Sequence, residues 1–185
     1  MADRFPPIPD DKQTPEQKAM VAAITSGPRG AGLRGPFNAL MRSPDVGNRV
    51  QHVGAYVRFS SCIGPKLTEL GICMVGRKWT AQYEWYAHRR LAEQAGLNPA
   101  ILDAIADGKR PANMDADETI VYNFSKELLD TTQVSDTTFD AMKNRFGEQG
   151  VIDLICALGY YSTVSMVLNV AQVPLPPDAV PLKPL

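Results

Sequence analysis

The 185-residue sequence is poor in the residues that build metal sites and disulfide frameworks. It holds two histidines and three cysteines, and the cysteines at positions 62, 73 and 156 form no C-x-x-C pair. An odd number of widely spaced cysteines indicates neither a disulfide framework nor a zinc knuckle. A chain of this length can bury a sizeable core without such staples. We therefore expect no metal site, no cofactor and no disulfide.

The sequence also lacks an excess of charge of either sign. Nineteen Lys and Arg residues face twenty Asp and Glu residues, which gives a net charge of −1. This balance excludes the broad basic surface of a general nucleic-acid-binding protein. The first nine residues carry charge and prolines where a signal peptide needs an apolar core, so we expect no secretion and a cytoplasmic location.

One long uncharged run, residues 154–172, has the length of a membrane span. It contains glycine, serine, threonine, tyrosine and asparagine, and neither lysine nor arginine flanks its ends. We interpret it as a buried core helix, and we expect no contact with a membrane.

Helical periodicity dominates the rest of the sequence. No alternation of apolar and polar residues persists long enough to predict a sheet. Caps and apolar spacings predict helices over about 14–25, 36–41, 43–60, 65–78, 80–95, 98–106, 114–129, 135–146 and 149–171. We predict an all-α, single-domain fold with an N-terminal arm (1–13), a helical core (14–172) and a proline-rich tail (173–185), the tail being a surface arm or a disordered end. The apolar helices at 65–78 and 151–171 predict a homo-oligomer, because they offer more apolar surface than a small monomer covers.

Two neighbouring helices place ionisable side chains among apolar ones. Glu84 and His88 lie one turn apart on the apolar stripe of the helix at 80–95, and Glu69 lies within the apolar helix before it. Buried carboxylates and imidazoles have shifted pKa values and serve as acids and bases. The alternatives are an ordinary surface pair for Glu84 and His88, and a structural anchor for Glu69.

This spacing resembles the carboxymuconolactone decarboxylase and alkylhydroperoxidase D-like superfamily. The resemblance covers roughly residues 35–106, and it is carried by LTELGICMVGR from Leu67, AQYEWYAH from Ala81 and LAEQAGL from Leu91. Its specific part is a glutamate followed nineteen residues later by a histidine, as Glu69 and His88 are. The resemblance implies a helical bundle of the alkylhydroperoxidase D-like type that assembles into trimers or hexamers.

Peroxidases of this superfamily carry a C-x-x-C pair before the histidine, at positions that correspond here to Ala81 and Glu84. Both thiols are absent, so the resemblance does not extend to thioredoxin-like peroxidase activity, which needs a nucleophilic and a resolving thiol. It implies instead a cofactor-free, decarboxylase-like lyase for a small, often aromatic-derived, acid or lactone. His88 would then protonate the carbanion or enolate, Glu84 would orient His88 or act as the base, and Glu69 would set the protonation of the imidazole.

An anionic substrate also needs a cation, and Arg58 and Arg77 are candidates for binding it, with structural ion pairs as the alternative. Tyr83 and Trp85 are candidates for the wall of an aromatic pocket. Two other functions stay open from the sequence: a non-catalytic oligomeric protein that binds a small ligand in the same pocket, and a hydroperoxidase-like protein that uses Cys73 without the usual dithiol.

Overall fold

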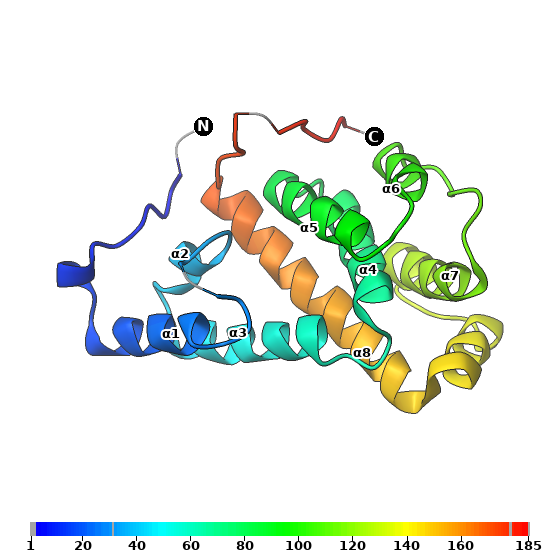
Figure 1. Cartoon of the computed structure of the whole chain (residues 1–185), viewed down its shortest axis with the longest axis horizontal. Helices are drawn as coiled ribbons and strands as arrows, with labels where there is room; N and C mark the ends of the chain where they lie inside the picture. Colours follow the sequence, from blue (N-terminus) through cyan, green and yellow to red (C-terminus); the bar gives the residue numbers. More distant parts are fainter. Residues whose placement is uncertain (1–2, 31, 178, 185) are drawn as a thin grey trace.

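The computed structural model describes residues 3–30, 32–177 and 179–184. These residues form helices and loops without a strand, which confirms the all-α prediction. A short 3-10 helix, η1 (Asp10–Lys12), precedes the helices α1 (Pro15–Thr25), α2 (Phe37–Leu40), α3 (Pro44–Phe59), α4 (Pro65–Lys78), α5 (Gln82–Gln94), α6 (Pro99–Ala106), α7 (Ala116–Thr131) and α8 (Asp136–Ala171) (Figure 1).

Helix α4 is the centre of the fold. All eleven residues from Leu67 to Arg77 are buried, and the helix packs against α3, α5, α6, α7 and α8. A helix that is apolar nearly all round needs neighbours on every side. The predicted burial of this helix is therefore confirmed, and Glu69 in its middle lies deep inside the protein.

Helix α8 is broken near its start at Gly147, whose φ of +70° is outside the helical range. Glycine adopts positive φ without a Cβ penalty, so the break needs no strain. The two parts correspond to the separate helices predicted over 135–146 and 149–171. The longer part runs diagonally across the molecule (Figure 1). Helix α8 as a whole packs against α2, α3, α4, α5 and α7. By length and composition it is the one helix of the described residues that could cross a membrane, and its packing supports its interpretation as a core helix.

Helices α3 and α8 approach each other closely at Gly54. A Cβ atom at this position would lie 2.1 Å from Cζ of the Tyr160 ring, so glycine alone leaves room for the ring. This contact holds Tyr160 against α3 and directs it toward the space between α3 and α5.

The proline-rich tail is held against the helices. Leu182 is buried, and the Gln82 side chain makes two hydrogen bonds with its backbone, donating to the carbonyl at 3.1 Å and accepting from the N–H at 2.8 Å. Arg77 donates to the Lys183 carbonyl at 2.8 Å. The described part of the tail is thus a fixed surface arm rather than a disordered end. Residues 1–2 of the predicted N-terminal arm, and 178 and 185 of the tail, lie outside the described residues.

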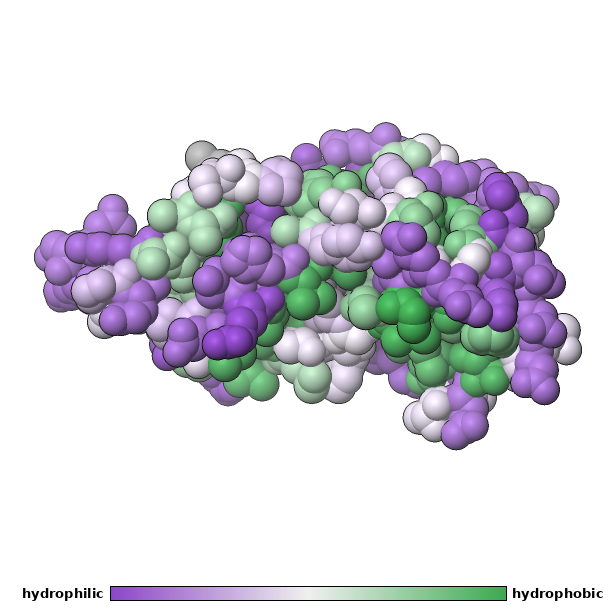
Figure 2. Space-filling view, turned by 90° about the horizontal axis from the view of Figure 1, so that it is seen from below, coloured by the Kyte–Doolittle hydropathy of each residue, from purple (hydrophilic) through white to green (hydrophobic). Residues whose placement is uncertain are grey.

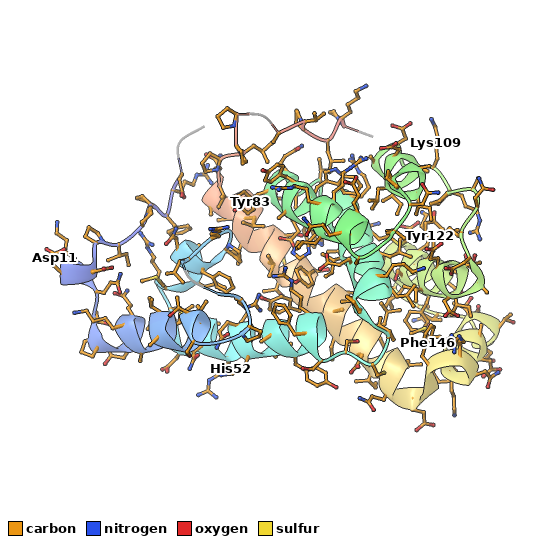
Figure 3. The ribbon with its side chains drawn as sticks, viewed as in Figure 1. Asp11, His52, Tyr83, Lys109, Tyr122 and Phe146 are labelled. Carbon is orange, nitrogen blue, oxygen red and sulfur yellow. The ribbon has the colours of Figure 1, made fainter. Side chains whose placement is uncertain are left out.

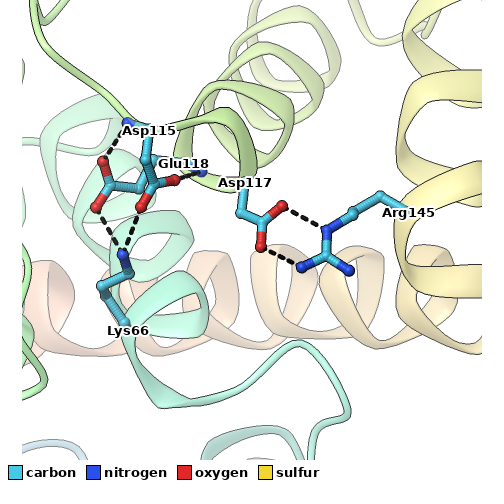
Figure 4. A network of polar contacts seen from close by, with 5 residues as sticks. All are labelled: Lys66, Asp115, Asp117, Glu118 and Arg145. Atoms are coloured by element: carbon cyan, nitrogen blue, oxygen red, sulfur yellow. Dashed lines mark hydrogen bonds and ion pairs between the residues drawn. The ribbon is translucent and has the colours of Figure 1, made fainter.

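A polar network joins α4, α7 and α8 on one side of the core (Figure 4). The Lys66 ammonium lies 2.8 Å from the Asp115 carboxylate and 2.9 Å from that of Glu118, whose side chain is only 7% exposed. Asp115 and Glu118 also bond to each other's backbone N–H in a capping box that starts α7. Arg145 pairs in a bidentate manner with Asp117. Lys66 therefore neutralises a carboxylate that would otherwise be buried without a counter-charge.

We expect Lys66→Ala to lower the free energy of unfolding by about 1–3 kcal/mol, because it leaves Glu118 buried and unpaired. Lys126→Ala is the matched control, since it removes an exposed pair with Asp130 and should change stability by less than about 0.5 kcal/mol. Urea titrations of the three proteins measure the difference. Equal effects of the two substitutions would show that the Lys66 network contributes no more than a surface ion pair.

Candidate functional site: a buried carboxylate–imidazole cluster

The imidazole of His88 lies between two carboxylates in the interior. Its Nδ1 is 2.6 Å from Oε2 of Glu69, and its Nε2 is 3.1 Å from Oε1 of Glu84. The first contact is a short hydrogen bond. The second lacks hydrogen-bond alignment, so Oε1 of Glu84 is buried without a hydrogen-bond partner. All three residues are at most 7% exposed. The structure therefore brings Glu69, Glu84 and His88 together, as their spacing predicts.

The connection between α4 and α5 produces this convergence. Only three residues, 79–81, join the two helices, so they return side by side in opposite directions. The two helices are in van der Waals range at Gly76 of α4, where an added Cβ would lie 3.5 Å from the backbone nitrogen of Trp85. Glu69 lies nine residues before the end of α4, and His88 lies six residues after the start of α5. The antiparallel helices thus bring the two side chains within reach of each other.

Glu84 and His88 both have pKa values above those of the isolated side chains. Burial alone would lower the pKa of His88, but the carboxylates of Glu84 and Glu69 outweigh it and raise that pKa above its ordinary value. Burial raises the pKa of Glu84, more than the attraction of the His88 imidazolium lowers it. A carboxyl group and an imidazole, both with raised pKa values, thus lie side by side, an arrangement typical of groups that transfer protons.

A cavity of about 620 Å³ opens beside the cluster. Glu84 and His88 line it, whereas Glu69 lies behind the imidazole and does not. Tyr160 and Tyr161 of α8 form the facing wall, and the edge of the Tyr161 ring contacts His88 with 4.8 Å between the ring centroids. Glu84 and His88 accordingly border a space large enough for a small molecule.

Arginines supply the charge of the cavity wall. Arg29, Arg34, Arg58 and Arg90 all line it. The Arg29 guanidinium stacks over the Phe37 ring at 5.1 Å and donates to the Gln51 carbonyl at 3.2 Å, and its Nε is buried without a partner. Arg58 Nε lies 3.7 Å from Oε1 of Glu69. Such a wall favours an anionic occupant, because guanidinium groups bind carboxylates in a bidentate manner.

Two of the four predicted binding residues lie at the cavity and two do not. Arg58 lines it from α3, and Tyr83 lines it from the start of α5 (Figure 3). Trp85 is buried on another side of α5, in a hollow shared with Leu182 of the tail. Arg77 is also buried elsewhere, where it donates to the Ala106 carbonyl and the Thr80 hydroxyl as well as to the tail. These two candidates are corrected: each holds the chain around α5 and neither faces the cavity.

Sequence reasoning missed the contributions of Arg29, Arg34, Tyr160 and Tyr161. The arginines belong to a glycine-rich loop whose path no periodicity predicts. The tyrosines lie in the uncharged run of α8. Two adjacent tyrosines in an otherwise apolar helix were the signal in the sequence that this helix borders a polar cavity. The other histidine, His52, points away from the molecule on the exposed side of α3 and takes no part (Figure 3).

The cysteines have the wrong surroundings for peroxidase chemistry. Cys73 is fully buried, and burial raises the pKa of its thiol well above the ordinary value, which disfavours the reactive thiolate. Cys62 and Cys156 are free and exposed. Within the described ranges no group of three or more His, Cys, Asp or Glu side chains is arranged to hold a metal ion.

Comparison with known proteins adds no assignment. A scan against protein-family models finds no match, and a search of curated proteins finds none. The resemblance drawn from the residues around Glu69 and His88 therefore stays a prediction.

The raised pKa of His88 makes a pH-dependent contribution to stability. Because the folded protein binds this proton more tightly than the unfolded chain, the stabilisation is fully present below the unfolded pKa of about 6.5 and is lost as the pH rises through the folded value. We expect wild-type protein to exceed His88→Asn in unfolding free energy by more at pH 5.5 than at pH 9. Denaturant titrations at both pH values measure this difference, with His52→Asn as the exposed control. A pH-independent difference would contradict the raised pKa.

Proposed function

We propose that the protein is a cofactor-free lyase that carries out decarboxylation, or a related proton transfer, on a small carboxylic acid or lactone. One observation carries this proposal: a carboxyl group and an imidazole with raised pKa values lie together at a cavity whose remaining charged side chains are arginines. The resemblance to the decarboxylase-like branch of the alkylhydroperoxidase D-like superfamily points in the same direction.

The chemistry of a β-keto or vinylogous acid suits these groups. Loss of CO₂ breaks the bond from the carboxylate carbon to the adjacent carbon and leaves the electron pair there as an enolate. His88, protonated and facing the cavity, stabilises the enolate oxygen or delivers a proton to the carbon. Glu84, 3.1 Å from Nε2, replaces that proton and is in turn reprotonated from water. The net reaction consumes one proton and releases one CO₂.

The surrounding residues have supporting roles in this scheme. Glu69 does not line the cavity, so it acts as a positioning residue that fixes the ring and keeps Nδ1 protonated through the 2.6 Å hydrogen bond. Arg29 and Arg58, which line the cavity, bind the carboxylate of the substrate before it is lost. Tyr83, Tyr160 and Tyr161 provide flat walls that suit a ring-shaped or conjugated acid.

The proposal extends to the setting of the enzyme. We expect a homo-oligomer, a trimer or a hexamer, that acts on a small-molecule acid in the cytoplasm and binds neither nucleic acid nor membrane. A non-catalytic protein that binds a small ligand in the same cavity is the main alternative, and turnover measurements separate it from the lyase.

We expect Glu84→Gln and His88→Asn each to reduce turnover at least about 100-fold, because each removes one proton-transfer group. The assay measures CO₂ release from a panel of β-keto acids and lactone acids. Matched controls exist on the same chain: Glu93→Gln changes an exposed carboxyl group of α5, and His52→Asn changes the exposed histidine. Circular dichroism at the assay temperature verifies that each variant is folded.

Binding of an acid without turnover by the wild-type protein would favour the ligand-binding alternative. Turnover that survives both substitutions would show that the cluster is structural.

A separate substitution tests the hydroperoxidase alternative. Because the buried Cys73 thiol has a strongly raised pKa and no C-x-x-C exists, we expect the Cys62→Ser, Cys73→Ser, Cys156→Ser triple variant to retain the lyase turnover of the wild type. The Cys62→Ser, Cys156→Ser double variant is the control, because it keeps the buried Cys73 thiol. Comparing the two variants by circular dichroism shows whether a serine hydroxyl at position 73 of the core impairs folding. If the folded triple variant loses activity while the double variant keeps it, the Cys73 thiol takes part in the reaction.

A further inference from the structure

The outer face of α8 carries an exposed stripe without charge over five turns. The stripe consists of Ile152, Ile155, Cys156, Gly159, Thr163, Met166 and Val170, which recur at three- and four-residue intervals and are all exposed. Four of them are large hydrophobic residues that are 40–58% exposed. Isolated exposed hydrophobic residues are ordinary, but a continuous stripe of them indicates an interaction surface.

The stripe is symmetric about Gly159. Ile152 lies seven residues before this glycine and Met166 seven residues after it, while Ile155 and Thr163 lie four residues to either side. No atom lies within 4 Å of the position that a Cβ at Gly159 would occupy, so the surface is open there. A small residue at the middle of a helix face lets a second helix approach closely.

Apolar aromatic residues extend this face on both sides of α8. Tyr56 of α3 accepts a hydrogen bond from Gln149 beside one end of the stripe, and Trp79 accepts one from Asn169 near the other through its backbone carbonyl. Both side chains are at least 40% exposed. Seen from below, hydrophobic residues form patches in the middle and lower right of the surface, between mostly hydrophilic left and right ends (Figure 2).

We propose that this face binds a second copy of the chain, with the two α8 helices crossing at Gly159 in antiparallel directions about a twofold axis. In this arrangement Ile152 of each copy lies against Met166 of the partner, and the two Gly159 residues face each other. A twofold interface requires a self-complementary surface. The stripe satisfies this requirement because its residues are spaced equally on both sides of Gly159 and because it carries no charge. A twofold contact of this kind fits a dimer or the expected hexamer but not an isolated trimer. The proposal is independent of the lyase activity.

The dimensions of the face suit a dimer. From Ile152 to Val170 the helix rises about 27 Å, and with the flanking aromatic residues the face is roughly two helix diameters, or 20 Å, wide. The two copies together would bury roughly 1,000 Å², which is the lower limit for a biological interface.

A second copy explains this face better than a lipid surface does. Helices that lie on membranes border their apolar face with lysine and arginine, which bind the anionic headgroups. Residues 154–172 of α8 include no charged residue, and the chain as a whole has a net charge of −1. An uncharged surface of this kind matches a copy of itself without like-charge repulsion.

Cysteine cross-linking tests the crossing point. In a Cys62→Ser, Cys156→Ser background, Gly159→Cys should give a covalent dimer under mild oxidation, whereas Lys109→Cys, at an exposed position away from α8, should not (Figure 3). A mixture of Ile152→Cys and Met166→Cys proteins should give more heterodimer than homodimer if the helices are antiparallel. A Gly159→Cys protein that stays monomeric while the control cross-links would overturn the proposal.

Solution measurements provide a second test that needs no disulfide. Ile152→Glu and Met166→Glu should each raise the dimer dissociation constant at least about 100-fold in sedimentation experiments. Lys109→Glu, which alters an exposed charge elsewhere, should leave it unchanged. Because both positions are exposed in the single chain, the variants should keep the wild-type circular dichroism spectrum. The proposal is wrong if wild-type protein is monomeric at 100 μM, if its association is insensitive to both substitutions, or if the stripe binds vesicles of anionic phospholipid instead.

Discussion

The short hydrogen bond between His88 and Glu69 is the constraint on which the rest of the structure depends. It joins α4 and α5 at 2.6 Å in the centre of the protein, where a lone charge would be costly. Removal of His88 would leave the buried Glu69 with Arg58 alone, and removal of Glu69 would leave His88 with Glu84 alone, so either loss should destabilise the protein. The same contact keeps the imidazole beside Glu84 and at the cavity wall. The interaction that holds two central helices together is therefore also the one that prepares the site.

Much of the local structure is predictable from the sequence because it depends on near neighbours. Thr14, Asn98 and Ser135 accept the N-cap hydrogen bonds that their positions indicate. The burial of α4 follows from its composition, and the meeting of His88 with Glu84 follows from helical spacing. Ser43 is an exception, because it precedes α3 without forming a cap hydrogen bond.

The parts that could not be predicted depend on contacts between segments far apart in the chain. Arg29 reaches the cavity because a loop folds back over α3, and the side chain of Gln82 binds the tail at Leu182, one hundred residues later. The same limitation explains Arg77 and Trp85. Arg77 is a candidate for its charge and Trp85 for its aromatic ring, but neither property identifies which side of its helix faces the cavity. Each is buried against a partner that periodicity does not identify.

The contact between Gly54 and Tyr160 restricts how this lineage can diverge. Since the phenol ring occupies the volume of any side chain at position 54, neither position can change alone without a clash or a void. A descendant with alanine or serine at 54 would need a smaller residue at 160. That exchange would remove one wall of the cavity and admit bulkier compounds. A pair of compensating mutations on α3 and α8 would thus reshape the cavity while Glu69, Glu84 and His88 on α4 and α5 stay unaltered.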